Sequence, residues 1–67
     1  MTESKIAVIW LRSQATDLRN VARKKRGAYA PTTILGQRCE RVAAAYERAA
    51  KLLEDEATAI ESEGATP

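Results

Sequence analysis

The sequence contains no histidine, no phenylalanine and only one cysteine, Cys39. Without histidine or further cysteines no Cys/His zinc site can be assembled, and Cys39 has no disulfide partner within one molecule. Neither a glycine-rich phosphate loop nor a metal-ligand spacing occurs. We therefore expect a reduced, cytoplasmic protein that holds no metal and no cofactor.

Long apolar runs are missing as well. The longest, IAVIWL from Ile6 to Leu11, is far shorter than the roughly 20 residues that a bilayer requires. Arg12 follows it directly, which argues against a signal peptide. We expect no membrane-spanning segment. A short apolar run can also be a buried strand, but no other segment of the chain resembles a strand that could pair with it.

What the sequence does contain is a seven-residue repeat between Cys39 and Ile60. Larger residues at Cys39, Tyr46, Leu53 and Ile60 alternate with Ala43, Ala50 and Ala57 at steps of four and three. This spacing is typical of a helix whose apolar seam packs against a partner helix. Cys39 is therefore interpreted as a small seam residue rather than a nucleophile, since no histidine can activate it.

Capping residues divide the chain into two helices in a single domain of 67 residues. We expect one helix over about 3–26, capped by Thr2 or Ser4, and a turn over 27–32 that contains Pro31. A second helix over about 33–63 is capped by Thr32 or Thr33, and residues 64–67 form a frayed tail. A connection this short makes the helices antiparallel, so the predicted fold is an all-α, coiled-coil-like hairpin.

Seam and charge patterns predict a register for this hairpin. The expected layers are Ala22–Cys39, Leu18–Ala43, Ala15–Tyr46, Leu11–Ala50 and Val8–Leu53. Beside the seam, basic residues of the first helix meet acidic residues of the second, and we call this side the charged flank. The expected ion pairs are Lys5–Glu54, Arg12–Glu47 and Arg19–Glu40. Such exposed pairs select register more than they stabilise.

The opposite side of the seam carries apolar residues that a lone hairpin would leave in water. This apolar flank consists of Ala7, Val21, Leu35, Val42 and Ala49, bordered by Trp10, with Ile6 and Ile9 further round. Exposed apolar surface of this kind usually marks an interface. We predict a non-enzymatic protein that uses it to self-associate, with a four-helix dimer as the simplest form, or to bind a partner protein. Trp10 is either a bundle core residue or an anchor for a foreign partner.

A cluster of cations at the turn supports a different function. We call it the basic tip, and it consists of Arg23, Lys24, Lys25, Arg26, Arg38 and Arg41, with Tyr29 in the loop. It can contact nucleic-acid phosphates while Tyr29 stacks on a base, which makes a nucleic-acid-binding regulator the alternative function. The same cations can instead complement the dipole at the end of the first helix.

The segment YERAAKLLEDEATAIES, from Tyr46 to Ser62, resembles the closing helix of small uncharacterised proteins encoded by phages of actinobacteria. It covers about a quarter of the chain. Those proteins are often Ala- and Arg-rich helical hairpins. The resemblance implies action in a bacterial host cytoplasm on a host or phage macromolecule, and it carries over no functional residue.

Overall fold

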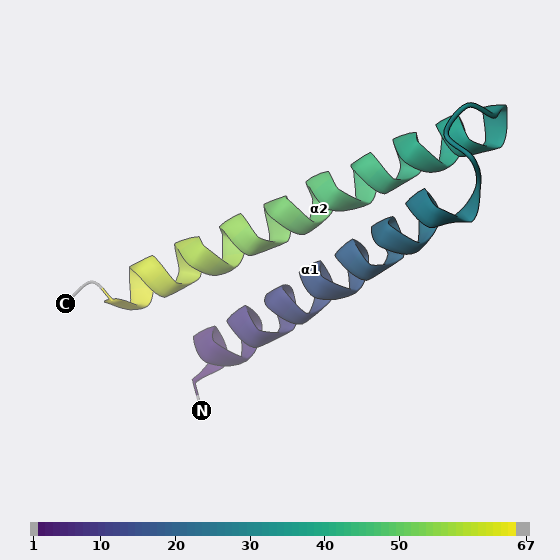
Figure 1. Ribbon diagram of the computed structural model, residues 1–67. Helices are drawn as coiled ribbons and strands as arrows, with labels where there is room; N and C mark the ends of the chain where they lie inside the picture. The colour runs from purple at the N-terminus through teal and green to yellow at the C-terminus, as the bar shows by residue number, and fades with distance from the viewer. Residues whose placement is uncertain (1, 66–67) are drawn as a thin grey trace.

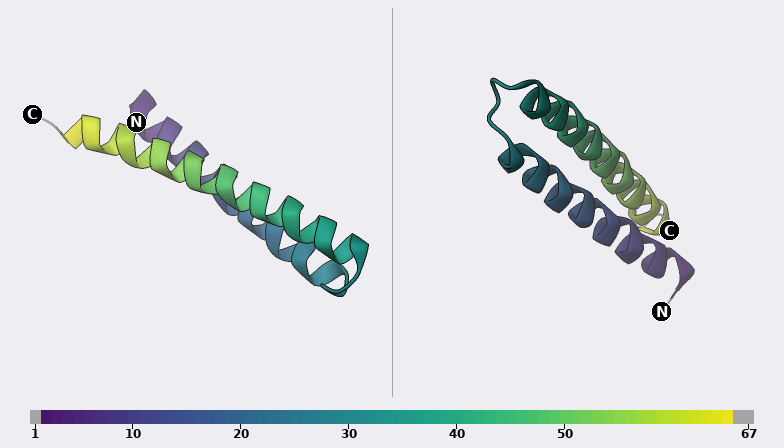
Figure 2. Two further views of the ribbon diagram at one scale, coloured as in Figure 1. Left: turned by 90° about the horizontal axis from the view of Figure 1, so that it is seen from above. Right: turned by 90° about the vertical axis from the view of Figure 1, so that its right-hand side faces the viewer.

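The structure is a computed structural model that describes residues 2–65. Two helices, α1 (Glu3–Ala28) and α2 (Ile34–Ala65), run antiparallel and lie side by side along their length (Figures 1 and 2). They form a rod that measures 53 × 17 × 10 Å between its outermost Cα atoms. The predicted all-α hairpin is therefore confirmed.

Helix α1 begins at a side-chain cap and ends at an extended residue. Thr2 is the N-cap, and its hydroxyl oxygen accepts a hydrogen bond of 3.3 Å from the backbone N–H of Lys5. The helix continues through Gly27 to Ala28, two residues beyond the predicted end, and Tyr29 then adopts φ −142° and ψ 155°. Gly27 is thus helical rather than a left-handed terminator.

The loop runs back along the first turn of α2 and does not form a tight turn between the two helices. The backbone N–H and the hydroxyl of Thr33 both donate to the carbonyl of Ala30, at 3.1 and 2.8 Å. The Thr33 oxygen in turn accepts from the N–H of Gly36 at 2.9 Å, so Thr33 caps α2. A Cβ at Gly36 would overlap the Ala30 carbonyl, and only glycine permits this approach.

At its far end α2 is longer than predicted. Gly64 and Ala65 belong to the helix, although the sequence placed them in a frayed tail. The rest of that predicted tail, Thr66 and Pro67, lies outside the described residues.

The core between the helices is thin because its buried residues are small. Val8 is 7% exposed, and the other buried apolar side chains are alanines: Ala15, Ala22, Ala43, Ala50 and Ala57. The larger seam residues are only half-buried, namely Leu11, Leu18, Cys39, Tyr46, Leu53 and Ile60. Within residues 2–65 no side chain larger than alanine is completely buried. Alanines let the helices approach closely but contribute little apolar area.

The ion pairs show that the predicted register is wrong. Arg12 pairs with Glu61, Arg19 with Glu54, and Arg26 with both Glu40 and Glu47. The expected pairs Lys5–Glu54, Arg12–Glu47 and Arg19–Glu40 do not form, and Lys5 has no ion pair among the residues that the structure describes.

The glutamates that pair with Arg12 and Arg19 lie 14 residues further along α2 than expected. The seam itself is displaced by one heptad, which corresponds to about 10 Å of helix rise. Val8, expected opposite Leu53, lines one groove together with Ile60 instead. Because Arg26 reaches Glu40, the first residues of α2 extend beyond the end of α1, as Figure 1 shows. Registers that differ by a heptad place the same residue types opposite each other, so the repeat alone cannot distinguish them.

Candidate interaction surface

The charged flank joins the two helices along most of the rod. Its ion pairs link α1 arginines to α2 glutamates, and these side chains are 38–58% exposed. Solvent screens pairs at this exposure, so they favour this register without supplying much stability. A further pair, Lys51 with Asp55 at 3.6 Å, lies within α2.

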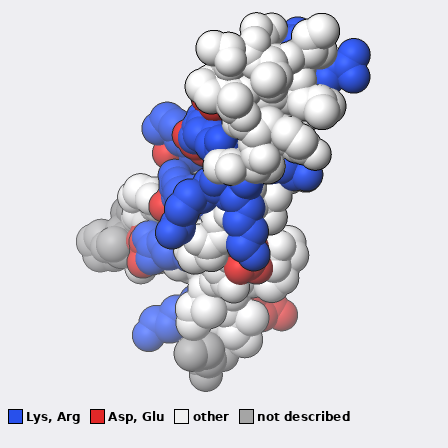
Figure 3. All heavy atoms as spheres, turned by 45° about the vertical axis from the view of Figure 1, so that its right-hand side comes forward, with Lys and Arg blue, Asp and Glu red and all other residues white. Residues whose placement is uncertain are grey.

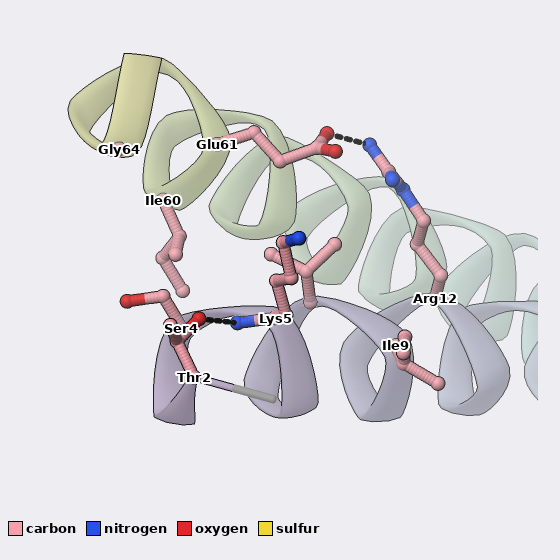
Figure 4. Close-up of a pocket in the computed structure, with 9 residues that line it drawn as sticks. Thr2, Ser4, Lys5, Ile9, Arg12, Ile60, Glu61 and Gly64 are labelled. Carbon is pink, nitrogen blue, oxygen red and sulfur yellow. Dashed lines mark hydrogen bonds and ion pairs between the residues drawn. The ribbon is translucent and has the colours of Figure 1, made fainter. Parts of the chain in front are cut away.

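Arg12 and Glu61 are the two groups of this flank whose acidity is clearly altered. The hydrogen bond that Arg12 donates lowers the pKa of the Glu61 carboxyl, and the same bond raises the pKa of the Arg12 guanidinium. Both groups therefore stay ionised at neutral pH. Their pair closes the end of the hairpin that lies away from the loop (Figure 4).

A groove lies beside this pair, between the start of α1 and the end of α2. Figure 4 shows its lining, which is Thr2, Ser4, Lys5, Val8, Ile9, Arg12, Ile60, Glu61 and Gly64. Glu61 is the one carboxylate among these lining residues, and it forms an ion pair with Arg12. The groove therefore offers apolar contacts and a neutralised charge pair, not the two convergent carboxylates that acid–base chemistry uses.

The apolar flank lies on the other side of the seam. Val42 precedes the buried Ala43 by one residue, while Glu47 follows it by four. At 100° per residue these two side chains project to opposite sides of the helix. Leu35 is 51% exposed and Val42 43%, whereas Val21, Ala7 and Ala49 are half-buried. The half-buried leucines of the seam also open toward this side, because each lies three residues after a buried Val8 or Ala15.

The predicted interface residues do not all share this flank. Ile9 lines the groove with Arg12 and Glu61, so it lies on the charged flank (Figure 4). Ile6 is 53% exposed and, by helical spacing, points directly away from the seam. Trp10, 58% exposed, borders the apolar flank as expected. The helix period therefore spreads Ile6, Ile9 and Trp10 around the outer surface of α1.

Two exposed apolar side chains were missed from the sequence. Leu52 is 70% exposed and lies three residues after Ala49, on the same side of α2. Ile34 is 72% exposed and opens α2 beside the loop. The three-residue spacing of Leu52 from Ala49 could have placed Leu52 on the apolar flank from the sequence alone. Ile34 precedes the buried Ala43 by nine residues, so by helical spacing it points away from the seam, and this spacing was a usable signal for Ile34.

The basic tip is only partly available for binding. Arg26 is engaged by Glu40 and Glu47, and Arg23 donates to the Asn20 side chain at 2.7 Å. Within residues 2–65, four cations of the tip form neither an ion pair nor a side-chain hydrogen bond: Lys24, Lys25, Arg38 and Arg41. Tyr29 is 51% exposed. Figure 3 shows an uncharged cap at the loop end, with Lys and Arg side chains gathered below it.

Folding separates charge along the rod. The half nearer the loop is residues 19–54, bounded by the Arg19–Glu54 pair, and it carries nine Lys or Arg and three Glu, a formal charge of +6. The remaining residues carry two Lys or Arg and six Asp or Glu, a formal charge of −4. We call these the basic half and the acidic half. The hairpin brings the start of α1 and the end of α2 together in the acidic half, so the protein is a strongly dipolar rod.

Comparisons with protein-family models, with curated proteins and with solved structures find no match to this chain. Within residues 2–65, no helix is long and apolar enough to cross a membrane. The same residues contain no group of three or more His, Cys, Asp or Glu side chains that could hold a metal ion.

Proposed function

We propose that the protein is a non-enzymatic interaction module that binds helices of another protein molecule through its apolar flank. The observation that carries this proposal is the thin core of the hairpin. Within residues 2–65 its fully buried side chains are alanines, while eight large apolar side chains are more than 40% exposed. A chain of this length usually needs a partner, a staple or very efficient packing to be stable.

Energetics favour a helical partner on this side. Fully burying one large apolar side chain contributes about 1.5–3 kcal/mol. A second pair of helices on the apolar flank would cover Leu35, Val42 and Leu52, and would also complete the burial of the half-exposed seam residues. The charged flank offers no such gain, because its arginines and glutamates already satisfy each other.

A charge placed on the apolar flank tests this function. Val42→Glu is expected to shift the protein from an oligomer to a monomer in sedimentation equilibrium over a wide concentration range. Gln37→Glu is the matched control, because it adds the same charge to an exposed site of α2 on the other side of the seam. The proposal requires the control to keep the wild-type mass. An oligomer that tolerates Val42→Glu as well as it tolerates Gln37→Glu would refute it.

A second candidate function is nucleic-acid binding through the basic tip. It is favoured by the unpaired Lys24, Lys25, Arg38 and Arg41 beside the exposed Tyr29. Phosphate contacts of this kind make affinity fall steeply with salt. Fluorescence anisotropy with single- and double-stranded oligonucleotides should then show weaker binding for Lys25→Gln/Arg41→Gln. The charge-matched control Lys5→Gln/Arg12→Gln, in the acidic half, should bind like wild type. Equal affinities for both variants would rule out the tip.

The cellular setting that we propose follows from the resemblance of the Tyr46–Ser62 segment. In this proposal the protein is a phage product that acts on a phage or host macromolecule in the cytoplasm of a bacterial host. A phage deletion of the coding region, tested for growth on the host, would examine this setting directly.

A further inference from the structure

We propose that the partner on the apolar flank is a second copy of this chain, packed face to face with its rod reversed. The loop end of each hairpin then covers the acidic half of the other. This inference rests on the proposed function and names the occupant of the same surface. A two-fold axis that crosses the middle of the rod relates the copies, and α1 and α2 of each copy complete a four-helix bundle.

The face that carries the apolar flank is large enough for such a dimer. The face of the hairpin that includes both helices measures 53 × 17 Å, which is on the order of 900 Å². A stable protein–protein interface buries about 800 Å² on each partner. A second copy therefore covers the whole face, whereas a single foreign helix about 10 Å wide would leave much of it in water.

The exposed apolar side chains are distributed at both ends of this face. Trp10 lies near the start of α1, while Leu35 lies at the loop end, beyond the end of α1. Val21, Ala49 and Leu52 lie between them. Reversal of the second rod sets the Trp10 region of one copy against the loop half of the other. In this arrangement the second copy covers both Trp10 and Leu35, which lie at opposite ends of the face.

Charge decides between a reversed and a parallel second rod. On and beside the apolar flank, Lys24 and Arg38 lie in the basic half, whereas Glu56 and Glu63, at heptad steps from Ala49, lie in the acidic half. A parallel pair would stack a +6 half on another +6 half. A reversed pair places each basic half on an acidic half of −4, which is complementary at both ends.

Distances between spin labels test this arrangement directly. Tyr29→Cys in a Cys39→Ser background carries one nitroxide at the exposed loop end, and double electron–electron resonance then measures the label-to-label distance in the oligomer. A reversed dimer predicts roughly 40–50 Å, close to the length of the rod. A parallel dimer predicts less than about 20 Å, on the scale of two helix-packing distances.

A mixed sample provides the matched control. Ser4→Cys in the same background labels the other end of the rod at an exposed site. In a reversed dimer, mixing the Tyr29→Cys and Ser4→Cys chains adds a short distance that neither chain shows alone. In a parallel dimer, mixing removes part of the short distance instead. Sedimentation must show that the labelled chains keep the wild-type mass.

The outcomes separate this inference from the function on which it rests. If Val42→Glu dissociates the oligomer but labels at position 29 lie close together, the interaction flank stands and the reversed arrangement is overturned. A wild-type chain that stays monomeric at every concentration overturns the second copy as occupant. A long distance at position 29, with a short distance in the mixed sample, supports the inference.

Discussion

Arg12 donates a hydrogen bond to Glu61 across 49 residues of chain, at the end of the hairpin opposite the loop. The same flank holds Arg19–Glu54 and Arg26–Glu47, so three successive heptads of α1 pair with three of α2 in reverse order. These pairs define the register of the hairpin. Because of these pairs, the stability of the hairpin should depend on pH and on single charges, and both dependences can be tested.

Acid should remove the contribution of the Arg12–Glu61 pair. Because the pKa of Glu61 is lower in the folded state than in the unfolded state, its stabilisation is present above the unfolded pKa. That stabilisation is lost as the pH falls through the folded pKa. Arg12→Gln should therefore lower the thermal midpoint at neutral pH, and the difference from wild type should vanish in acid.

NMR titration of the Glu61 carboxyl carbon provides the direct measurement. Arg12→Gln should raise the Glu61 pKa toward that of an ordinary exposed glutamate. Lys51→Gln is the control, because Lys51 pairs with Asp55 inside α2 and should leave Glu61 unchanged. A Glu61 pKa that is identical in wild type and Arg12→Gln would show that Arg12 and Glu61 do not form this ion pair in solution.

Charge reversal distinguishes the observed register from the one expected from the sequence. Arg19→Glu should destabilise the hairpin by about 0.2–1 kcal/mol, and adding Glu54→Arg should restore most of that loss. Adding Glu40→Arg instead should restore none of it, because Glu40 contacts Arg26. Urea unfolding followed by circular dichroism at one fixed protein concentration measures all three variants. Rescue by Glu40→Arg would favour the alternative register.

Glycine to alanine substitutions should have opposite effects at different positions. Gly36→Ala should be destabilising, since the new Cβ would overlap the Ala30 carbonyl and push the loop away from α2. Gly27→Ala should stabilise by up to about 1 kcal/mol, because Gly27 is helical and nothing lies within 4 Å of an added Cβ. Thermal unfolding of both variants at matched concentration measures the difference. A neutral Gly36→Ala would show that the loop is not held against α2.

The alanine seam should not tolerate a large side chain. Ala50 is fully buried between the helices, so Ala50→Leu should force them apart and cost about 1–3 kcal/mol. Thr58→Leu adds a similar side chain at an exposed site of α2 and should change stability by less than about 0.5 kcal/mol. Chemical denaturation of the two variants tests the difference. Equal stabilities would mean that the helices are not in close contact at Ala50.

The sequence by itself determined the two helices, their antiparallel pairing and the two flanks of the seam. Steps of three and four between Val8 and Ala22, and between Cys39 and Ile60, are local properties of each helix, so no tertiary information was needed. The N-cap at Thr2 was among the two predicted caps for the same reason. The position of Val42 opposite the ion-pairing glutamates likewise follows from helix geometry.

Only the tertiary structure decided how far one helix slides along the other. A heptad repeat matches equally well after a shift of seven residues, and the contact between Ala30 and Gly36 resolves that ambiguity by laying the loop along α2. In the observed register Arg12 pairs with Glu61, which lies 14 residues beyond the expected Glu47. The hairpin sets the basic middle of the chain at one end of the rod and the acidic end of α2, beside the start of α1, at the other. The charge separation on which the reversed dimer depends is therefore a property of the fold.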